Sequence, residues 1–453
     1  MKNKTKFSLS TTQIILLSFL VTILLGSLLL ALPISSANGS AVPYIDALFT
    51  ATTATCVTGL VTLPTATTWS VFGQLVILIL IQVGGLGVIT IISGFMLMFN
   101  QKMGIKDRLL IKDAFNLNTM YGLGRFIKNV LIGTFLIEAL GALLYMTVFV
   151  PEFGVRGIWI SIFNSVSAFC NAGIDIIGEN SLCDYATNTV VNVVTSFLII
   201  LGGIGFIVWW DILRVLKGRT TKNKHIFRYL NLHTKIAIIT TLILIVSGGL
   251  LIFVFEYNNP LTIGNMSVLD KLKVSFFQSI TTRTAGFATV NQESLTGAST
   301  IVSLILMFIG GSPVGTAGGV KTVTVVVLLC SAFATIRNKS AATIFNRTIS
   351  VDSICKAVSV VSMFVVILFC AILLLIATTD FSITDVLYES VSAAATVGLS
   401  RNLTAKLHLV GKIIIILAMY FGRIGPISLA IAFASSGPNQ NVISAPEEDI
   451  SIG

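Results

Sequence analysis

Apolar residues are gathered into eight long stretches that recur along the whole chain. Each is about 20 residues or longer, which is enough for a helix to cross a hydrocarbon layer of roughly 30 Å. The stretches lie at 13–32, 71–99, 126–150, 190–210, 234–255, 300–334, 355–377 and 410–434. This pattern predicts an all-α membrane protein in which eight helices span the lipid.

Composition and the placement of charge agree with a membrane chain and predict its orientation. Of the 453 residues, 55% are hydrophobic and only 11% are charged, whereas a soluble domain has about 25% charged residues. The net charge of +10 could indicate a nucleic-acid partner, but 20 of the Lys and Arg residues lie in the N-terminus and the connections 102–128, 214–235 and 337–356, against seven in the alternate connections. The positive-inside bias then places both termini and the basic connections in the cytoplasm, with lipid rather than nucleic acid as the partner.

Four short segments in the outward connections match one another without gaps. Each has an aromatic residue ten positions before a glycine: Phe49 and Gly59, Phe163 and Gly173, Phe276 and Gly286, Tyr388 and Gly398. Successive glycines are 114, 113 and 112 residues apart, so the chain consists of four near-equal units. The predicted repeats are 1–100, 101–215, 216–336 and 337–435, followed by a C-terminal cytoplasmic tail at 436–453.

These segments are too short to cross the bilayer, so we expect them to enter and return on one side, lining a shared central pore in a pseudo-fourfold arrangement. The first part of each can form a helix whose C-terminal end presents partial negative charge to a cation. The backbone that follows must turn its carbonyls toward the axis, as in potassium-channel filters, and glycine permits this. The predicted ion-binding residues are Val57, Thr58, Gly59, Asn171, Ala172, Gly173, Thr284, Ala285, Gly286, Thr396, Val397 and Gly398.

The outward connections also carry eleven acidic residues. They are Asp46, Glu152, Asp175, Glu179, Asp184, Glu256, Asp270, Glu293, Asp380, Asp385 and Glu389. A negative mouth would concentrate cations, although the same residues could simply solvate the loops.

A second glycine-rich element follows each segment, inside the next apolar stretch. The copies are Gly84-Gly85-Leu86-Gly87, Gly202-Gly203-Ile204-Gly205, Gly310-Gly311-Ser312-Pro313 and Gly422-Arg423-Ile424-Gly425-Pro426. Small residues permit either close helix contact or unwinding. We expect helix packing alone to explain the first two copies but not the last two.

The third copy is the strongest candidate for a gate. A helix cannot run smoothly through five glycines and a proline, so a flexible intramembrane loop is expected beneath the filter. The segment superficially resembles a phosphate loop, but Val320 stands where a glycine should precede Lys321, and no strand comes before it. The predicted gate residues are Gly310, Gly311, Ser312, Pro313, Gly315, Thr316, Ala317, Gly318, Gly319, Lys321 and Arg423.

Two of these gate residues have open alternatives. Arg423 lies deep in an apolar stretch, where it either repels cations near the axis or forms an ion pair, with Glu138 as the candidate partner. Lys321 could instead extend its amine to the cytoplasmic interface.

The strings Cys-Val-Thr-Gly-Leu at 56–60, Phe-Cys-Asn-Ala-Gly at 169–173 and Gly-Gly-Ser-Pro-Val-Gly-Thr-Ala-Gly-Gly-Val-Lys-Thr at 310–322 resemble the Trk/Ktr/HKT superfamily of potassium transporters. The resemblance covers essentially the whole chain and is greatest to the membrane subunit of the bacterial Ktr systems. It implies a gate in the third repeat and potassium bound at Gly59, Gly173, Gly286 and Gly398. In that family, glycine at all four positions goes with potassium selectivity, and serine in the first copy is associated with sodium.

The resemblance also implies partners and a location. In the Ktr family a homodimer of the membrane subunit sits on a cytosolic RCK-type ring, KtrA-like or KtrC-like, that binds ATP or ADP. This chain has no visible nucleotide-binding motif, so nucleotide control would come from that ring. The connection 214–235 and the tail after Ser435 are candidate docking surfaces, or carry ordinary positive-inside charge. The expected function is potassium uptake, sodium-dependent, across the bacterial plasma membrane.

Two other functions are less compatible with the pattern. A secondary transporter for sodium or another monovalent cation would place its sites between repeats of opposite orientation. Here each unit has two spans, so all four share one orientation, which favours an axial pore. An intramembrane enzyme is not predicted, because the apolar stretches contain no nucleophile-and-base pair or metal-binding constellation.

Overall fold

The computed structural model describes residues 10–99, 104–114, 122–217, 226–339 and 341–425. The predicted tail at 436–453 and the middle of the basic connection 214–235 lie outside the described residues. The described chain is predominantly helical, as expected. Polar side chains begin many of the helices by accepting a hydrogen bond from a backbone amide of the first turn, which is the usual N-cap contact; they are Ser10, Ser70, Asn188, Ser267, Thr296, Ser350 and Ser382.

One order of elements occurs four times along the chain. A long first helix is followed by a short pore helix, an irregular segment and a second helix. The first helices are α1 (Thr11–Leu30), α7 (Leu123–Phe153), α12 (Leu232–Glu256) and α16 (Val351–Thr378). The pore helices are α2 (Tyr44–Cys56), α8 (Val155–Cys170), α13 (Val268–Thr281) and α17 (Ile383–Ala394). The second helices are α4 (Val71–Leu86), α9 (Thr189–Gly203), α14 (Gly297–Phe308) and α18 (Leu409–Ile424).

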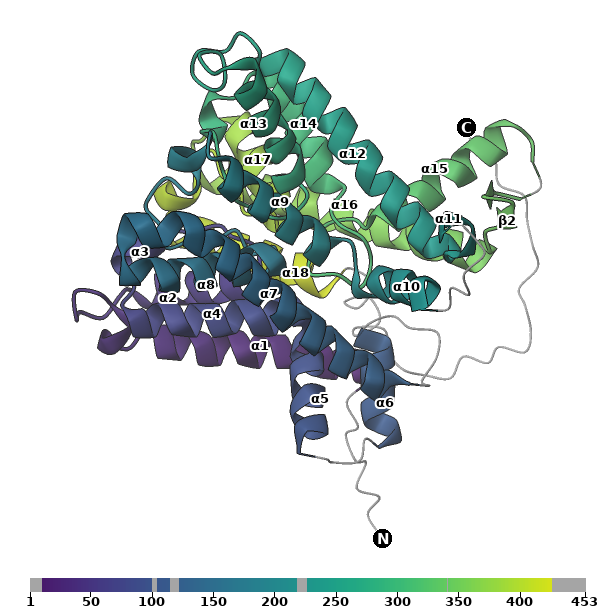
Figure 1. The fold of residues 1–453 in the computed structure, drawn as a ribbon, viewed down its shortest axis with the longest axis horizontal. Coiled ribbons are helices and arrows are strands. Elements are labelled where there is room, and N and C mark those ends of the chain that lie inside the picture. Colours follow the sequence, from purple (N-terminus) through teal and green to yellow (C-terminus); the bar gives the residue numbers. More distant parts are fainter. Residues whose placement is uncertain (1–9, 100–103, 115–121, 218–225, 340, 426–453) are drawn as a thin grey trace.

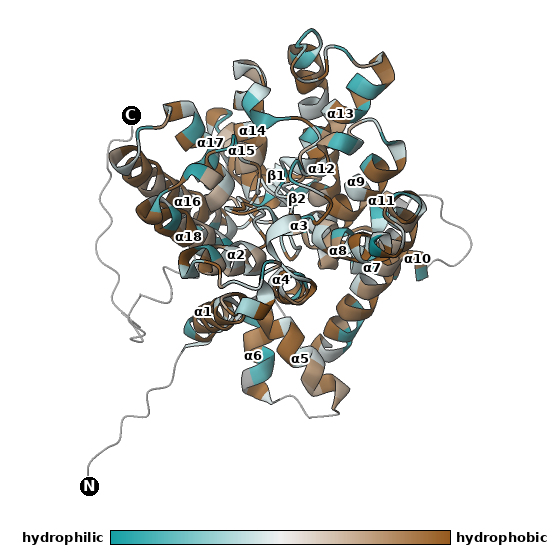
Figure 2. Cartoon of the chain, turned by 90° about the vertical axis from the view of Figure 1, so that its left-hand side faces the viewer, coloured by the Kyte–Doolittle hydropathy of each residue, from teal (hydrophilic) through white to brown (hydrophobic). Residues whose placement is uncertain are grey.

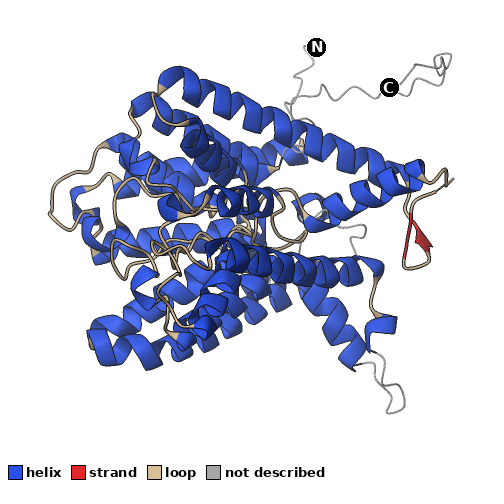
Figure 3. Cartoon of the chain, turned by 90° about the horizontal axis from the view of Figure 1, so that it is seen from above, coloured by secondary structure: helices blue, strands red, loops and turns tan. Residues whose placement is uncertain are grey.

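Shorter elements connect or extend these groups. They are η1 (Pro33–Ser35), α3 (Thr65–Thr68), α5 (Val88–Met98), α6 (Ile105–Ala114), η2 (Cys183–Tyr185), α10 (Phe206–Lys217), α11 (Ile226–Tyr229), η3 (Gln292–Ser294), α15 (Thr322–Ile336), β1 (Thr343–Ile344), β2 (Arg347–Thr348) and η4 (Thr404–Lys406). The two strands form a small antiparallel hairpin at the end of the molecule opposite the loops that follow the pore helices (Figure 3).

The four groups occupy four sectors around a common centre, in chain order (Figure 2). This is the predicted pseudo-fourfold arrangement, and we refer to the groups as repeats one to four; their boundaries at 100, 215 and 336 stay predictions. Hydrophobic residues cover the outer helices α1, α7 and α16. Only 17–33% of the most apolar window of each first helix is buried inside the protein, so most of that surface is left to face lipid.

The second helices are broken, which differs from the expectation of eight continuous spans. Among the described residues only the four first helices are long and apolar enough to cross a membrane unbroken. The axis turns by 94° between α4 and α5 and by 91° between α9 and α10, and α5 leaves the bundle (Figure 1). Gly87 and Gly205 stand at these turns with φ of 85° and 96°, a left-handed region that glycine enters without a Cβ penalty.

The expectation that packing alone explains the first two glycine elements was therefore wrong. Those elements do pack closely, because a Cβ on Gly84 would overlap the carbonyl oxygen of Thr55 at the end of α2, and one on Gly202 would overlap that of Phe169 in α8. The helix nevertheless ends within three residues of each pair. Close packing and a break coexist in both copies.

An ion pair joins the first repeat to the last. Lys412 Nζ in α18 lies 2.5 Å from Asp46 Oδ1 in the first turn of α2, and the two side chains are only 15% and 8% exposed. The pair closes the circle of repeats at the end of the bundle where the pore helices begin.

Candidate ion-conduction site

Four glycines, one from each repeat, meet at the centre of the bundle. A Cβ built on Gly59 would lie 2.6 Å from the carbonyl oxygen of Ala172, one on Gly173 would lie 2.5 Å from that of Ala285, and one on Gly286 would lie 2.6 Å from that of Val397. A Cβ on Gly398 would overlap the carbonyl oxygen of Thr58, which closes the circle. We call Gly59, Gly173, Gly286 and Gly398 the glycine ring. The structure thus brings together all twelve residues predicted to bind ions.

The backbone makes the same turn in every copy of the ring. Two positions before each glycine, the residue is in the left-handed region with φ between 52° and 68°; these residues are Val57, Asn171, Thr284 and Thr396. A β-branched residue such as Val57 is rare in this conformation, and such strain is retained where the surrounding structure enforces it. The surroundings, not the local residue type, therefore impose the turn.

Hydroxyl groups of the pore helices hold the turned backbone. Thr53 Oγ1 accepts from the Gly59 amide at 3.0 Å, and Ser392 Oγ accepts from the Gly398 amide at 3.1 Å. In the second repeat, Ser167 Oγ accepts from the amide of Ile174, one residue beyond the glycine, at 3.1 Å.

Sequence reasoning missed these contacts although a signal was present. Thr53, Ser167 and Ser392 all lie six positions before their glycine, whereas the third repeat has Ile280 there. That repeat uses Thr281 instead, whose hydroxyl donates to the Phe287 carbonyl at 2.7 Å.

Two hydroxyl groups next to the ring glycines have no hydrogen-bond partner in the protein. The hydroxyls of Thr58 and Thr396 are buried without a hydrogen-bond partner, and both residues are 0% exposed. Buried polar atoms in proteins nearly always find a partner, so such orphans need an explanation. A bound cation or a water molecule would supply it.

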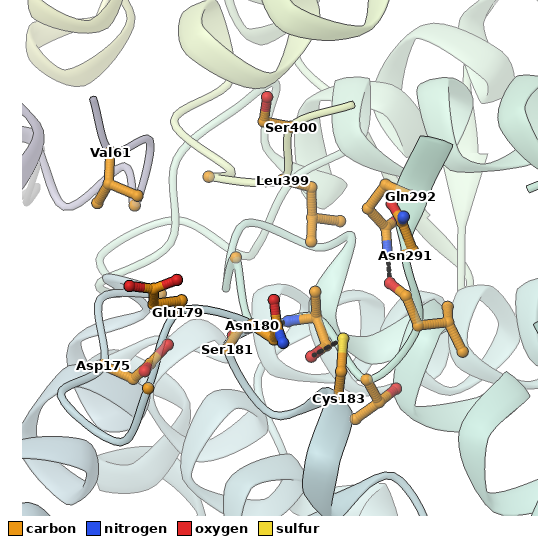
Figure 4. A pocket seen from close by; sticks show the side chains of 18 of the residues that line it. Val61, Asp175, Glu179, Asn180, Ser181, Cys183, Asn291, Gln292, Leu399 and Ser400 are labelled. Atoms are coloured by element: carbon orange, nitrogen blue, oxygen red, sulfur yellow. Dashed lines mark hydrogen bonds between the residues drawn. The ribbon is translucent and has the colours of Figure 1, made fainter. Parts of the chain in front are cut away.

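A vestibule of about 590 Å³ opens above the ring, and all four ring glycines line it (Figure 4). Asp175 and Glu179 contribute carboxylates, and none of the described residues that line the vestibule is Lys or Arg. Three of the other predicted outward acids form ion pairs: Asp46 with Lys412, Asp270 with Lys273 and Asp385 with Arg401. Of the eleven acidic residues predicted to form a negative mouth, the vestibule lining contains two, Asp175 and Glu179, both from the second repeat.

Asp175 gives the vestibule a carboxyl group that titrates close to neutral pH. Burial raises the pKa of its carboxyl to about 6, although the amide of Ile177, which donates at 3.3 Å, favours the charged form. As the pH falls through about 6, this carboxylate gains a proton and its attraction for cations is lost. We expect the apparent affinity for the transported cation to weaken about threefold between pH 7.5 and 5.5, from the loss of one charge at the mouth.

Uptake kinetics at the two pH values test this expectation. Asp175→Asn should show the weaker affinity at both, whereas Glu179→Gln should weaken affinity but keep the pH step, because Asp175 is still present. A pH step that persists in Asp175→Asn would contradict the assignment.

Below the ring, an irregular segment lies between α14 and α15. We call residues 310–321 the intramembrane loop. Its neck is closed by the Gly310 amide, which donates to the Val320 carbonyl at 3.0 Å. Its far side rests on the break of the second repeat, where the amides of Ser312 and Thr316 donate to the carbonyls of Gly203 and Gly202 at 2.9 and 3.1 Å.

The intramembrane loop also touches the segments that carry the ring. The Gly318 amide donates to Thr284 Oγ1 at 3.0 Å, and a Cβ on Gly318 would overlap the side chain of Thr396. The Thr316 hydroxyl donates to the Phe169 carbonyl at the end of α8, at 3.1 Å. The loop therefore lies directly beneath the ring, where the sequence predicted it.

Arg423 bridges the intramembrane loop to the first repeat. Its guanidinium donates to the Thr316 carbonyl at 2.5 Å and to the Gly84 carbonyl, near the end of α4, at 2.6 Å. The partial negative charge of a helix C-terminus favours a cation in that place. Arg423 does not pair with Glu138, whose carboxylate instead accepts from Gln82 Nε2 at 3.2 Å.

Lys321 turns back into the protein. Its Nζ donates to the Ala317 carbonyl at 2.5 Å, within the same loop. This contact favours a place for the amine within the loop over an extension to the cytoplasmic interface.

A vestibule, a ring of four backbone turns and a loop beneath that ring define a membrane transport protein of the pore-loop type. Comparisons with known proteins give the family. Residues 2–444 match the TrkH family of cation transport proteins. The chain belongs to this family, as its motifs predicted.

Relatives and a solved structure agree. The potassium/sodium uptake protein NtpJ of Enterococcus hirae is 38% identical, over 100% of this chain and 99% of NtpJ. The Ktr system potassium uptake protein B of Bacillus subtilis is 39% identical, over 97% of this chain and 96% of its own length. The crystal structure of TrkH from Vibrio parahaemolyticus superposes with a TM-score of 0.75 at 16% identity, covering 96% of this chain and 87% of that one. These relatives are named as transporters, so the chain is a multi-pass transport protein and not an enzyme.

Proposed function

We propose that this chain takes up potassium through the glycine ring, which acts as a selectivity filter. The observation that carries the proposal is the ring itself, in which each glycine faces the carbonyl of the next repeat at the floor of the vestibule. Carbonyl oxygens arranged around an axis replace the hydration shell of a monovalent cation. The two orphan hydroxyls, on Thr58 and Thr396, add ligands beside this ring. The relatives named as potassium uptake proteins support potassium as the ion.

The intramembrane loop is the proposed gate. It lies beneath the ring and contacts all four repeats. It is hydrogen-bonded to Thr284, to the break of α9 and to Arg423, which ties it to α4, and it packs against the side chain of Thr396. A cation leaving the ring inward would meet this loop and the charge of Arg423. Opening would require that these hydrogen bonds be released together.

The orientation and the partners are also proposals. Both termini and the basic connections are placed in the cytoplasm of a bacterial cell by the charge bias, so the vestibule faces outward. The name of the Bacillus subtilis relative refers to a Ktr system, which supports a regulatory partner: a cytosolic nucleotide-binding ring beneath a homodimer of this chain.

Ion uptake in a potassium-transport-deficient bacterium tests the proposal. Cells with this chain should grow and accumulate potassium at low external concentrations, and co-expression of a Ktr-type cytosolic subunit should raise the rate. Potassium accumulation no different from that of cells without the chain, at verified membrane expression, would refute it.

Sodium is the second candidate, because the Enterococcus hirae relative is named for both ions. The same cells distinguish its two possible roles. Potassium uptake that requires external sodium supports coupling, whereas sodium uptake that excludes potassium would favour a sodium transporter.

A further inference from the structure

One buried arginine is peculiar to the third repeat. Three positions before the ring glycine, the other repeats have the small residues Cys56, Cys170 and Ala395, but the third has Arg283. The side chain follows the pore helix α13 and directly precedes Thr284, which makes the left-handed turn into the ring. The segment that carries the ring glycine Gly286 thus contains a positively charged side chain.

The Arg283 guanidinium is held by neutral groups alone. The residue is 7% exposed, and one of its terminal nitrogens lies 3.3 Å from Thr241 Oγ1 of α12 and 3.5 Å from the Gly310 carbonyl oxygen. Its Nε has no partner, and the described residues form no ion pair with it. An unpaired charge within a membrane protein is costly and indicates a functional role.

Helix ends explain how this charge is tolerated. Arg283 follows the C-terminal end of α13, and it lies against the carbonyl of Gly310, just beyond the C-terminal end of α14. Gly203, at the end of α9, lines the same small cavity. Three helix C-termini therefore present partial negative charge to one guanidinium.

The cavity beside Arg283 leaves no room for a ligand. Its volume is about 10 Å³, which is at most the space of one water molecule. It is lined largely by Ile199, Ile200, Ile204 and Ile280, so it is apolar apart from the arginine and Thr241. A cavity of this size has no space for an anion beside Arg283, so the contact with the loop carries the argument.

Arg283 and Thr284 both form hydrogen bonds to the neck of the intramembrane loop, on the side that faces the ring. Arg283 contacts the carbonyl of Gly310, where the loop begins, and Thr284 accepts from the amide of Gly318, where it returns. Gly310 and Gly318 are themselves close, because a Cβ on Gly310 would overlap the carbonyl oxygen of Gly318. Two consecutive residues of one filter segment thus contact both sides of the neck.

We infer that Arg283 is a positioning residue that couples the third segment of the glycine ring to the intramembrane loop. The inference rests on the proposed gate and says how that gate would be regulated. The loop can open only when its hydrogen bonds to Arg283 and Thr284 break. The ring in the third repeat and the gate then change together, so ion selectivity and flux are linked through one side chain. Arg423 holds the loop from α4 and α18, and Arg283 holds it from the ring.

A double-mutant cycle in the full chain tests the coupling. Potassium flux and the ratio of potassium to sodium affinity are measured for the wild type, for Arg283→Gln, for deletion of residues 311–318, and for the combination. Arg283→Gln should raise flux about threefold and lower the affinity ratio in the full chain, yet change flux by less than about 1.3-fold once the loop is deleted. Arg156→Gln, which removes an exposed arginine from the first turn of α8, is the control and should leave all values unchanged.

The results of this cycle distinguish a failure of the proposed gate from a failure of the coupling through Arg283. If the deletion alone leaves flux unchanged, the proposed gate fails. If the deletion raises flux but Arg283→Gln acts equally in both backgrounds, the gate stands and the coupling is wrong. A purely structural role would lower flux without altering the affinity ratio.

A conservative variant and a second readout cover a failure to fold. Arg283→Lys keeps the charge with a single donor group and should restore part of the wild-type flux and affinity ratio. In purified protein, amide hydrogens at 310–319 should exchange several-fold faster in either variant than in the wild type, while those of the vestibule segment 176–186 stay unchanged. Equal exchange in the loop would overturn the inference.

Discussion

Gly398→Ser is expected to remove most of the preference of this chain for potassium over sodium. Gly398 has φ of 97°, and any Cβ there would overlap the Thr58 carbonyl oxygen and lie 2.8 Å from the Cα of Gly59. The backbone of the first and fourth repeats must then move apart, and local strain of this kind costs about 1–3 kcal/mol. We expect the affinity for potassium to fall at least about tenfold relative to that for sodium, measured as the concentration dependence of uptake of each ion.

A control substitution at Gly154 distinguishes the steric clash of a Cβ from the strain of a positive φ. Gly154 has a positive φ of 58°, but no atom lies within 4 Å of a Cβ built on it. Gly154→Ser should therefore keep the wild-type selectivity at similar expression. Unchanged relative affinities in Gly398→Ser, at normal expression, would count against the ring as the site of selection.

Deleting residues 311–318 should produce the largest increase in flux. The deletion removes the amides that bind Gly202, Gly203 and Thr284, together with the Thr316 carbonyl that receives Arg423. The space beneath the ring is then open. We expect potassium flux into membrane vesicles to rise about tenfold, within the range typical of coupling between a gate and a conduction site.

Arg423→Gln is the milder form of the same experiment. It leaves the loop in place but loses the bridge from Thr316 to Gly84, so flux should rise less than after the deletion. Arg401→Gln is a matched control, because Arg401 is also partly buried in the fourth repeat but pairs with Asp385 at the outer end. Lower or unchanged flux in a well-expressed deletion variant would refute the loop as a gate.

The position of the glycine ring could be predicted because its segment recurs four times in the sequence. The aromatic residue, the small polar residues and the glycine recur at fixed spacing, so one alignment located Gly59, Gly173, Gly286 and Gly398 together. The intramembrane loop was located by composition, since five glycines and a proline exclude a helix. Both signals are local, and neither requires knowledge of which segments touch.

Hydrogen bonds from side chains to backbone atoms could not be predicted from the sequence. Arg423 was given Glu138 as a candidate partner because an acid is the only counter-charge that residue letters display, whereas its partners are the carbonyls of Gly84 and Thr316. The breaks at Gly87 and Gly205 were missed for a related reason. A glycine that packs and a glycine that turns have the same letter, and only the backbone conformation distinguishes them.

The contact between Asp46 and Lys412 joins residues from opposite ends of the described chain. Asp46 therefore has this counter-ion only when the fourth repeat has been made and has packed against the first. A chain that lacks α18 would leave the Asp46 carboxylate without Lys412, so closure of the circle depends on the last of the four repeats.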